Sequence, residues 1–526
     1  CRGIEPGQVR AFSSCCRKAP VLNATTSGSR RWWVLLVMAC VASRIATTIT
    51  YIEDPDSLRF ALSVANGFDL AAMQPHFPGY PIFWAVVTPL YAGLGSFSTV
   101  FSIVGGLATA GIVGAVLFLW KRPLVSVPGM ALAALVVLNP LVWLLGNRYM
   151  PDLLGTACAI AALAFLVRSA AGGEKLDPRF AMIGVAGAGL LAGLRLSYLP
   201  LLLVPVLVVF WKGWTERGVA FAGRLFIVGL VSVAVWLVPM IVDTGWHSLI
   251  DVATAQTAGH FTEFGGTVQT ESDLSRRTAG FMRSLWADGL GAWWPGRHPV
   301  TLAVGLGVLG LGVAGTRELV RRALWRRRTF WVVLVGLLTY AFWVFFFQNV
   351  VHKSRHVLPL IPFILWLVCV GGTAIWSSVR LRIPSRIVTV GFIAAYAAVT
   401  FVLVQQHRSP TAIAQVKAFL DKEASRTDSL RVVSDPLVNT YLDAQDVPAR
   451  FIPINDTAAV REAVRGGEGR TVVVGTYPRT IEVPPDRERR FNHNPFVNRM
   501  WSDVTVHIYE FNPSRHGSTE HANDDH

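Results

Sequence analysis

Residues 32–50 read WWVLLVMACVASRIATTIT, an apolar block whose length suits one helical crossing of a ~30 Å hydrocarbon layer. Arg30 and Arg31 stand directly before it, and basic residues with paired tryptophans are typical of the cytoplasmic end of a membrane helix. Eleven similar blocks follow, at approximately 80–97, 99–120, 124–146, 152–168, 181–194, 197–211, 222–242, 299–315, 329–349, 356–376 and 384–405. We therefore predict a polytopic α-helical membrane protein with about 11–13 transmembrane helices.

The composition supports this class and excludes others. Of 526 residues, 52% are hydrophobic and 15% are charged, and the mean hydropathy is +0.45. An average soluble domain carries about 25% charged residues, so a soluble enzyme is excluded. The formal charge is +15, from 48 Lys and Arg against 33 Asp and Glu. Because no basic domain surrounds the arginine-rich connector 317–328, we interpret this excess as an orientation signal and not as nucleic-acid binding.

The connectors between the blocks indicate the orientation of the chain. Basic connectors collect on the cytoplasmic side, and they occur at 121–122, 168–179, 212–224, 317–328 and 380–386. With these connectors inside, the loops 51–79 and 243–298 and the tail after residue 406 lie outside. The first outer loop is acidic, which agrees with this orientation.

One conflict stays open in this topology. Residues 80–120 must cross the membrane an odd number of times, yet they contain two apolar blocks. Either the block 80–97, which contains Pro81 and Pro89, is broken or re-entrant, or the basic pair at 121–122 departs from the charge rule.

We divide the chain into four parts: a disordered cytoplasmic leader (1–29), a transmembrane domain (30–405), a small extracytoplasmic α/β domain (406–515) and a disordered tail (516–526). The α/β domain is predicted from a helical pattern and three strand-like runs between Pro, Gly and Asp turns, at 411–424, 430–435, 470–476 and 504–511. We expect an integral protein of the plasma (inner) membrane whose catalytic face is extracytoplasmic.

The first outer loop carries the strongest chemical signal. Glu53, Asp54 and Asp56 lie within four positions at the start of a predicted helix. Near the membrane surface a carboxylate can act as a general base toward an acceptor hydroxyl or amide. Pro55 keeps Asp54 extended, so the side chains of Asp54 and Asp56 diverge and do not serve one point together. The alternative is that these acids only cap the helix and hold the loop outside.

Four motifs, in order along the chain, carry a resemblance to a known family. They are Asp56-Ser57 with PHFPGYP (75–81), NRYMPD (147–152), RLSYLP (195–200) and SRHVLPLIP (354–362). Together they resemble the GT-C superfamily of membrane glycosyltransferases, such as the protein O-mannosyltransferases and the lipid A aminoarabinose transferases. Ser57 stands where many members have a second acid, so either Asp56 or Asp54 can be the base, and we favour Asp56.

This resemblance implies an inverting glycosyltransferase of the cell envelope. Its donor would be a sugar, a mannose-like hexose or a pentose, carried on a polyprenyl phosphate. Its acceptor would be a glycan, a lipid or a protein at the extracytoplasmic membrane face. No cofactor is implied with certainty, and a divalent cation stays open.

Basic residues at outer helix ends support an anionic substrate independently of the family. Arg148, Arg195, Lys353 and Arg355 lie where the charge rule expects few cations, so they need a partner. A lipid-linked phosphate supplies one, and fixed cations there favour its departure as a leaving group. The alternatives are contact with lipid headgroups and, for these arginines, pairing with Asp152.

Further substrate contacts are assigned to Glu53, His76, Tyr80, Asp152 and His356. For His76 the alternative is a hydrogen bond that holds its own loop.

No metal site is predicted. His260 and Glu263 have a spacing that suits one helix face, but the following Gly265 and Gly266 indicate a flexible loop.

Two other functions were weighed against sugar transfer. A transporter or flippase of a lipid-linked or anionic solute would carry charges in the middle of its helices, whereas the apolar blocks are nearly free of charges and Arg44, an exception, lies close to the outer end of the first helix. The third alternative is a catalytically inactive GT-C-like assembly partner, which the presence of Ser57 keeps open.

Overall fold

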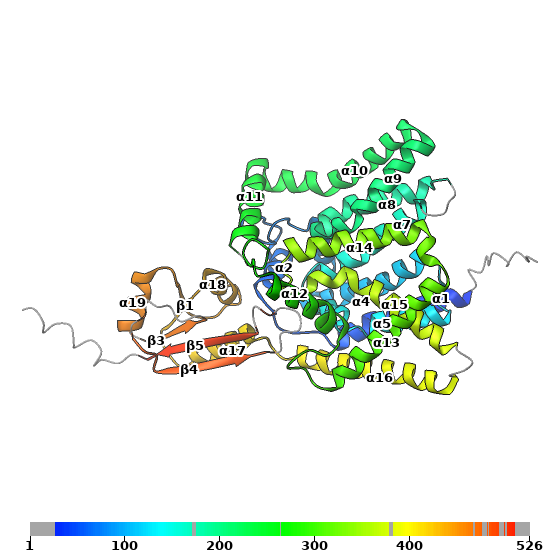
Figure 1. Cartoon of the computed structure of the whole chain (residues 1–526). Coiled ribbons are helices and arrows are strands. Elements are labelled where there is room, and N and C mark those ends of the chain that lie inside the picture. Colours follow the sequence, from blue (N-terminus) through cyan, green and yellow to red (C-terminus); the bar gives the residue numbers. More distant parts are fainter. Residues whose placement is uncertain are drawn as a thin grey trace, which may run out of the picture.

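The computed structural model describes residues 27–170, 175–263, 265–377, 382–466, 469–475, 481, 483–493, 499 and 502–510. The predicted tail 516–526 and all but the last three residues of the predicted leader 1–29 lie outside these residues. Figure 1 shows two parts, a bundle of helices and a small α/β domain at one end of it.

The bundle contains sixteen α-helices with short 3₁₀ and π segments between some of them. In chain order the elements are α1 (Ser27–Ala46), α2 (Pro55–Asn66), α3 (Pro81–Leu94), α4 (Phe97–Leu119), α5 (Val127–Val137), α6 (Pro140–Gly146), α7 (Asp152–Ala170), α8 (Pro178–Arg195), η1 (Leu196–Tyr198), α9 (Pro200–Arg217), α10 (Val219–Thr244), α11 (Trp246–Thr262), α12 (Leu274–Met282), η2 (Arg283–Gly289), α13 (Val300–Arg321), η3 (Leu324–Arg326), α14 (Arg328–Phe347), η4 (Ser354–Leu360), α15 (Ile361–Trp376) and α16 (Arg382–His407).

Fewer helices qualify as membrane spans than the predicted number. Among the described residues eight helices are long and apolar enough to cross a membrane, or nine if α5 and α6, bent by 59°, form one span. The chain is thus an integral membrane protein, but the expected 11–13 crossings included α1, α3 and α9. The helices α1 and α9 each contain three charged residues, and most of these residues lie outside the apolar blocks 32–50 and 197–211 from which the spans were predicted.

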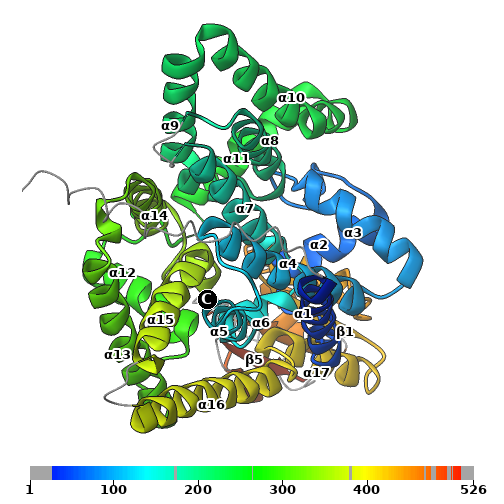
Figure 2. The same ribbon diagram turned by 90° about the vertical axis from the view of Figure 1, so that its right-hand side faces the viewer.

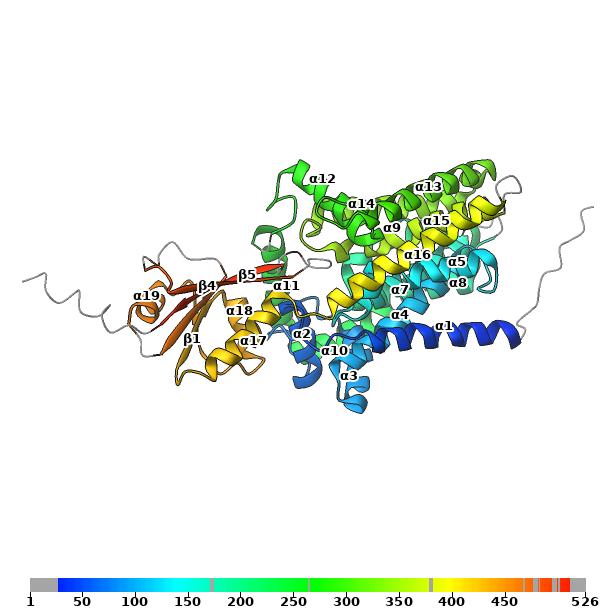
Figure 3. The same ribbon diagram turned by 90° about the horizontal axis from the view of Figure 1, so that it is seen from below.

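The short helix α3 removes the topological conflict. It has 14 residues, so it extends about 21 Å, less than the hydrocarbon thickness. Figure 3 shows it lying across the direction of the bundle close to α2. Between residues 80 and 120 only α4 has the length of a span, so the acidic loop 51–79 and the basic pair at 121–122 lie at opposite ends of the bundle, as the charge rule requires.

Glycines let α4 approach two neighbours closely. A Cβ on Gly105 would overlap the backbone carbonyl of Gly146 in α6, and one on Gly106 would meet the backbone of Val41 in α1. Such small residues let helix backbones pack where lipid offers no hydrophobic driving force. The main core of the bundle continues from this contact through α7, α13 and α15.

The small domain is a mixed sheet with helices on both faces. Its elements are α17 (Ala412–Ala424), β1 (Leu430–Ser434), α18 (Pro436–Asp443), β2 (Arg450–Pro453), α19 (Thr457–Gly466), β3 (Arg470–Val474), β4 (Arg487–Asn492) and β5 (Asp503–Tyr509). The strand order is β2-β1-β3-β5-β4, with β1 parallel to β2 and β3 and the other pairs antiparallel. Alternate residues face opposite sides: Val432 and Val472 pack with α17 and α18, whereas Val433 and Val473 pack with α19.

The predicted small α/β domain is confirmed. The runs at 430–435, 470–476 and 504–511 correspond to β1, β3 and β5, whereas β2 and β4 were missed. β4 reads RERRFN and is an exposed edge strand, so it carries no apolar alternation.

Helix α2 connects the two parts. Its residue Leu58 is 2% exposed and belongs to the core that α17, α18 and the sheet form. Tyr441 donates a hydrogen bond to the carbonyl of Ile52 at 2.6 Å, and Thr411 donates one to the carbonyl of Glu53 at 2.8 Å. The small domain therefore holds the start of α2, where the acidic residues lie.

Candidate functional site

One arginine, Arg148, pairs with both acids at the start of the first acidic loop, Glu53 and Asp54. Asp54 is extended before Pro55 and caps α2, its Oδ1 accepting from the Ser57 N–H at 2.8 Å. Its Oδ2 pairs with Arg148, whose Nε lies 3.2 Å from Glu53 Oε2. Burial raises the pKa of Glu53, but Arg148 and His407 outweigh it and hold that pKa at about 2. Glu53 and Asp54 are almost fully buried, so both act here as partners of Arg148.

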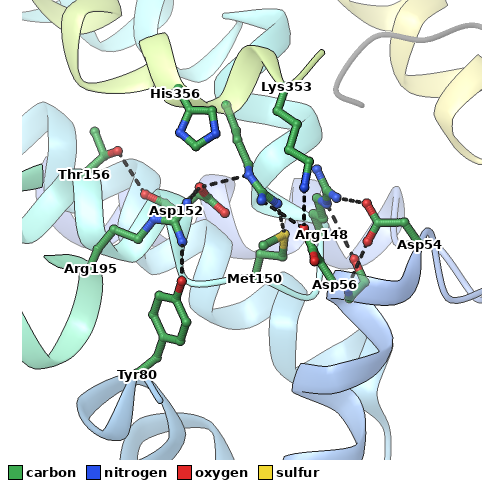
Figure 4. A network of polar contacts seen from close by, with 12 residues as sticks. Asp54, Asp56, Tyr80, Arg148, Met150, Asp152, Thr156, Arg195, Lys353 and His356 are labelled. Carbon is green, nitrogen blue, oxygen red and sulfur yellow. Dashed lines mark hydrogen bonds and ion pairs between the residues drawn. The ribbon is translucent and has the colours of Figure 1, made fainter. Parts of the chain in front are cut away.

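Asp56 points to a different pair of cations. Its Oδ2 lies 3.0 Å from Lys353 Nζ, a contact drawn in Figure 4, and 2.9 Å from Arg355 Nη2. Burial raises the pKa of Asp56, but these two cations dominate and hold it well below its usual range. Its side chain is 17% exposed, against 1% for that of Asp54. Asp56 is thus the ionised carboxylate that a substrate reaches more easily.

A second group lies beside this one, at the starts of α3 and α7 and the end of α8. Asp152 Oδ1 lies 2.7 Å from Arg195 Nη2, and Arg195 Nη1 donates to the Tyr80 hydroxyl at 3.0 Å. Arg355 Nε lies 3.9 Å from the same Asp152 oxygen. Arg355 therefore contacts both Asp56 and Asp152, and it joins the two groups.

Two histidines border this network. His76 Nε2 lies 3.3 Å from the Tyr80 hydroxyl, and burial lowers the pKa of His76 to about 3, so its ring is neutral at neutral pH. The alternative role for His76, a hydrogen bond to its own loop, thus has a partner in Tyr80. His356 is 6% exposed and lies in η4 beside Arg355.

Several buried polar atoms of this site have no hydrogen-bond partner among the described residues. They are His76 Nδ1, Arg148 Nη1, Asp152 Oδ2, Arg195 Nε and His356 Nδ1. Buried polar groups are nearly always satisfied by protein, water or ligand. Their concentration in one network indicates that the site holds a polar ligand or ordered water.

The structure brings all the sequence-predicted site residues to the end of the bundle that carries the small domain. Pro55 separates the side chains of Asp54 and Asp56 as expected, and the two acids face different cations. The basic residues bind acids of the chain itself, so the alternative of acid pairing holds for Arg195 with Asp152. His260 Nε2 donates a hydrogen bond to the carbonyl of Phe347 at 2.8 Å, and the described residues contain no group of three possible metal ligands.

Sequence reasoning missed Arg499 of the small domain. Its guanidinium pairs with Asp288 of η2, contacts the Ser354 hydroxyl at 2.9 Å and donates to the carbonyls of Val350 and Val351. These contacts hold the segment that carries Lys353 and Arg355. No motif surrounds Arg499, and only the pairing of distant elements reveals it.

Comparison with known proteins gives the fold. The structure is similar to the crystal structure of ArnT from Cupriavidus metallidurans in the apo state, with a TM-score of 0.50 at 13% identity over 91% of this chain and 98% of that one. The chain has the GT-C fold. This confirms the fold that the four motifs imply.

Two further structures match the GT-C fold of the chain at lower TM-scores. ArnT from the same organism bound to undecaprenyl phosphate gives 0.49 at 14% identity, covering 90% and 98% of the two chains. The oligosaccharyltransferase AglB from Archaeoglobus fulgidus, in complex with an inhibitory peptide and a dolichol-phosphate, gives 0.43 at 12% identity, covering 85% and 70%. No protein-family model matches the sequence, and no curated protein matches it.

Proposed function

We propose that the protein is an inverting glycosyltransferase that moves a sugar from a polyprenyl-phosphate-linked donor to an acceptor at the extracytoplasmic membrane face. The observation that carries this proposal is Asp56, an accessible carboxylate held between Lys353 and Arg355. The GT-C fold and the unpartnered polar atoms around it support the same function.

In the proposed reaction Asp56 accepts the proton of the acceptor hydroxyl or amide. The acceptor atom forms a bond to the anomeric carbon, and the bond from that carbon to the phosphate oxygen breaks. The electron pair leaves with the polyprenyl phosphate, and inversion follows because the acceptor attacks from the opposite side. Lys353 and Arg355 stabilise the added negative charge on the phosphate.

The same two cations couple donor binding to base strength. Without donor they hold the pKa of Asp56 low, which makes it a weak base. A donor phosphate that shares Lys353 and Arg355 weakens their hold on Asp56, so the pKa of Asp56 rises. Asp56 thereby becomes a better base when the donor is in place.

Arg195, Asp152 and Tyr80 are proposed to shape the donor side of the site. Asp152 uses one oxygen for Arg195, and its other oxygen has no partner among the described residues, as is also true of Arg195 Nε. These atoms can bind sugar hydroxyls or phosphate oxygens next to Arg355.

The outer face is proposed from the distribution of charge. The arginine-rich stretch 317–328 covers the end of α13, η3 and the first residue of α14, and the site lies at the opposite end of the bundle beside η4. Since basic connectors stay in the cytoplasm, the site and the small domain come out on the extracytoplasmic side.

The test is transfer of labelled sugar from a polyprenyl-phosphate donor in membranes that contain the full-length protein. Asp56→Asn is expected to abolish transfer, while Asp69→Asn, in an exposed turn of the same loop, serves as the matched control. Full activity of Asp56→Asn would refute the assignment of the base. Counter-flow of an unmodified lipid-linked solute in proteoliposomes, without covalent product, would favour a transporter instead.

A further inference from the structure

A cavity of about 520 Å³ lies at the end of the bundle opposite to the candidate site. Its lining comes from the ends of α4, α13 and α15 that point away from the site and from the start of α5. Figure 2 looks onto this end of the bundle, where α5, α13 and α15 lie close to one another. The volume falls within the range of about 300–1,000 Å³ that is usual for ligand sites.

One wall of the cavity is apolar and aromatic. Trp120 and Trp366 stack with ring centroids 4.0 Å apart and planes 11° from parallel. Val116, Leu132 and Val370 also line the cavity. Such a surface suits a hydrocarbon chain, whereas a hydrophilic ion in the cavity would not remove this apolar surface from water.

Another part of the lining carries three arginines and one carboxylate, Arg122, Arg321, Arg322 and Glu318. Glu318 is 7% exposed, and it accepts from Arg321 Nε at 2.7 Å and from Arg322 Nε. This buried acid orients both guanidinium groups and leaves the two Nη atoms of Arg322 available. Among the described residues the side chain of Arg122 has no hydrogen-bond or ion-pair partner. This part of the lining therefore has an excess of positive charge and free hydrogen-bond donors.

We propose that this cavity binds one anionic phospholipid. The lipid phosphate takes hydrogen bonds from Arg122 and Arg322, and an acyl chain lies against the stacked Trp120 and Trp366. A ligand that is anionic at one end and apolar at the other satisfies both walls, and the surrounding bilayer supplies it. This site is separate from the sugar-transfer site and does not depend on the function proposed for it.

The proposal is tested by titrating purified, delipidated full-length protein with dioleoyl phosphatidylglycerol and reading bound lipid by native mass spectrometry. Arg122→Gln with Arg322→Gln is expected to weaken binding roughly thirtyfold, since each basic residue near a lipid surface contributes about 1 kcal/mol. Arg317→Gln with Arg328→Gln removes the same charge from exposed positions at this end that do not line the cavity, and it should leave binding unchanged.

A second variant keeps the charge and blocks the space. Ala374→Phe places an aromatic side chain in the cavity lining, and it is expected to abolish retention of the phospholipid. Equal affinity for dioleoyl phosphatidylcholine, or unchanged binding in Ala374→Phe, would overturn the proposal. Displacement by an equal concentration of undecaprenyl phosphate, or by inorganic phosphate, would overturn it too, because the occupant would then be the lipid carrier or a simple anion.

Discussion

Replacing Arg148 by Met should destabilise the protein strongly and in a pH-dependent way. The substitution leaves Glu53 and Asp54 buried without their shared cation, with side chains 5% and 1% exposed. Removing one partner of a buried ion pair costs about 3–5 kcal/mol, because the remaining charge stays desolvated. We expect the midpoint of thermal unfolding in detergent at pH 7.5 to fall by several degrees.

The loss of stability in Arg148→Met depends on pH, and the pKa of Glu53 determines its direction. In the native protein Glu53 has a depressed pKa of about 2, so it adds stability above its unfolded pKa, and that stability is lost as the pH falls toward 2. Without Arg148 the largest influence that lowers the pKa of Glu53 is lost and His407 remains, so that pKa rises and Glu53 adds less stability as the pH rises through its unfolded value of about 4.3. The difference between native protein and variant should therefore shrink between pH 7.5 and pH 4.5.

A compensating variant completes this experiment. Glu53→Gln and Asp54→Asn together with Arg148→Met remove both charges, and Asn is as good a helix cap as Asp. This triple variant should recover most of the lost thermal stability. An unchanged gap at pH 4.5, or a triple variant as unstable as the single one, would refute the buried-charge explanation.

Two further predictions concern the small domain. Leu58→Ala should cost about 2–5 kcal/mol in a core that α2 shares with that domain, and limited proteolysis should then release the domain earlier than in Leu62→Ala, whose side chain is only partly buried. Arg499→Met should lower kcat for sugar transfer more than it raises KM, because it loosens the segment of Lys353 and Arg355 without touching the substrate. Arg499→Lys should restore part of the rate. A rate of Arg499→Met equal to that of the native protein would show that the segment is held without Arg499.

The membrane class and the small domain could be predicted because their signals are local, whereas the GT-C fold was implied by the resemblance of four motifs to a known family. Apolar length, basic connectors and strand alternation each lie within a short stretch of sequence. The predicted number of spans was higher than the number of helices that qualify, because α1 and α9 combine apolar runs with charged residues. β4 escaped because an exposed edge strand has no buried face to reveal it.

The sequence indicated that the site residues would lie near one another, but it did not indicate how they would pair. The charge rule identified Arg148 and Lys353 as cations that need partners. It did not indicate that Arg148 would bind Asp54 and Lys353 would bind Asp56. Which acid meets which cation depends on how helices far apart in sequence pack together, and no spacing along the chain encodes it. The same is true of Arg499, which reaches its partners from the other end of the chain.

The packing of α2 against the small domain also bears on the order of synthesis. The ribosome delivers Glu53, Asp54 and Asp56 early, whereas α17, α18 and the sheet that enclose Leu58 are delivered after the helices of the bundle. A nascent chain thus inserts its helices before the support for its acids exists. We expect premature stop codons after α16 to yield chains that insert into the membrane but remain inactive, so that translation of the small domain acts as the switch for activity.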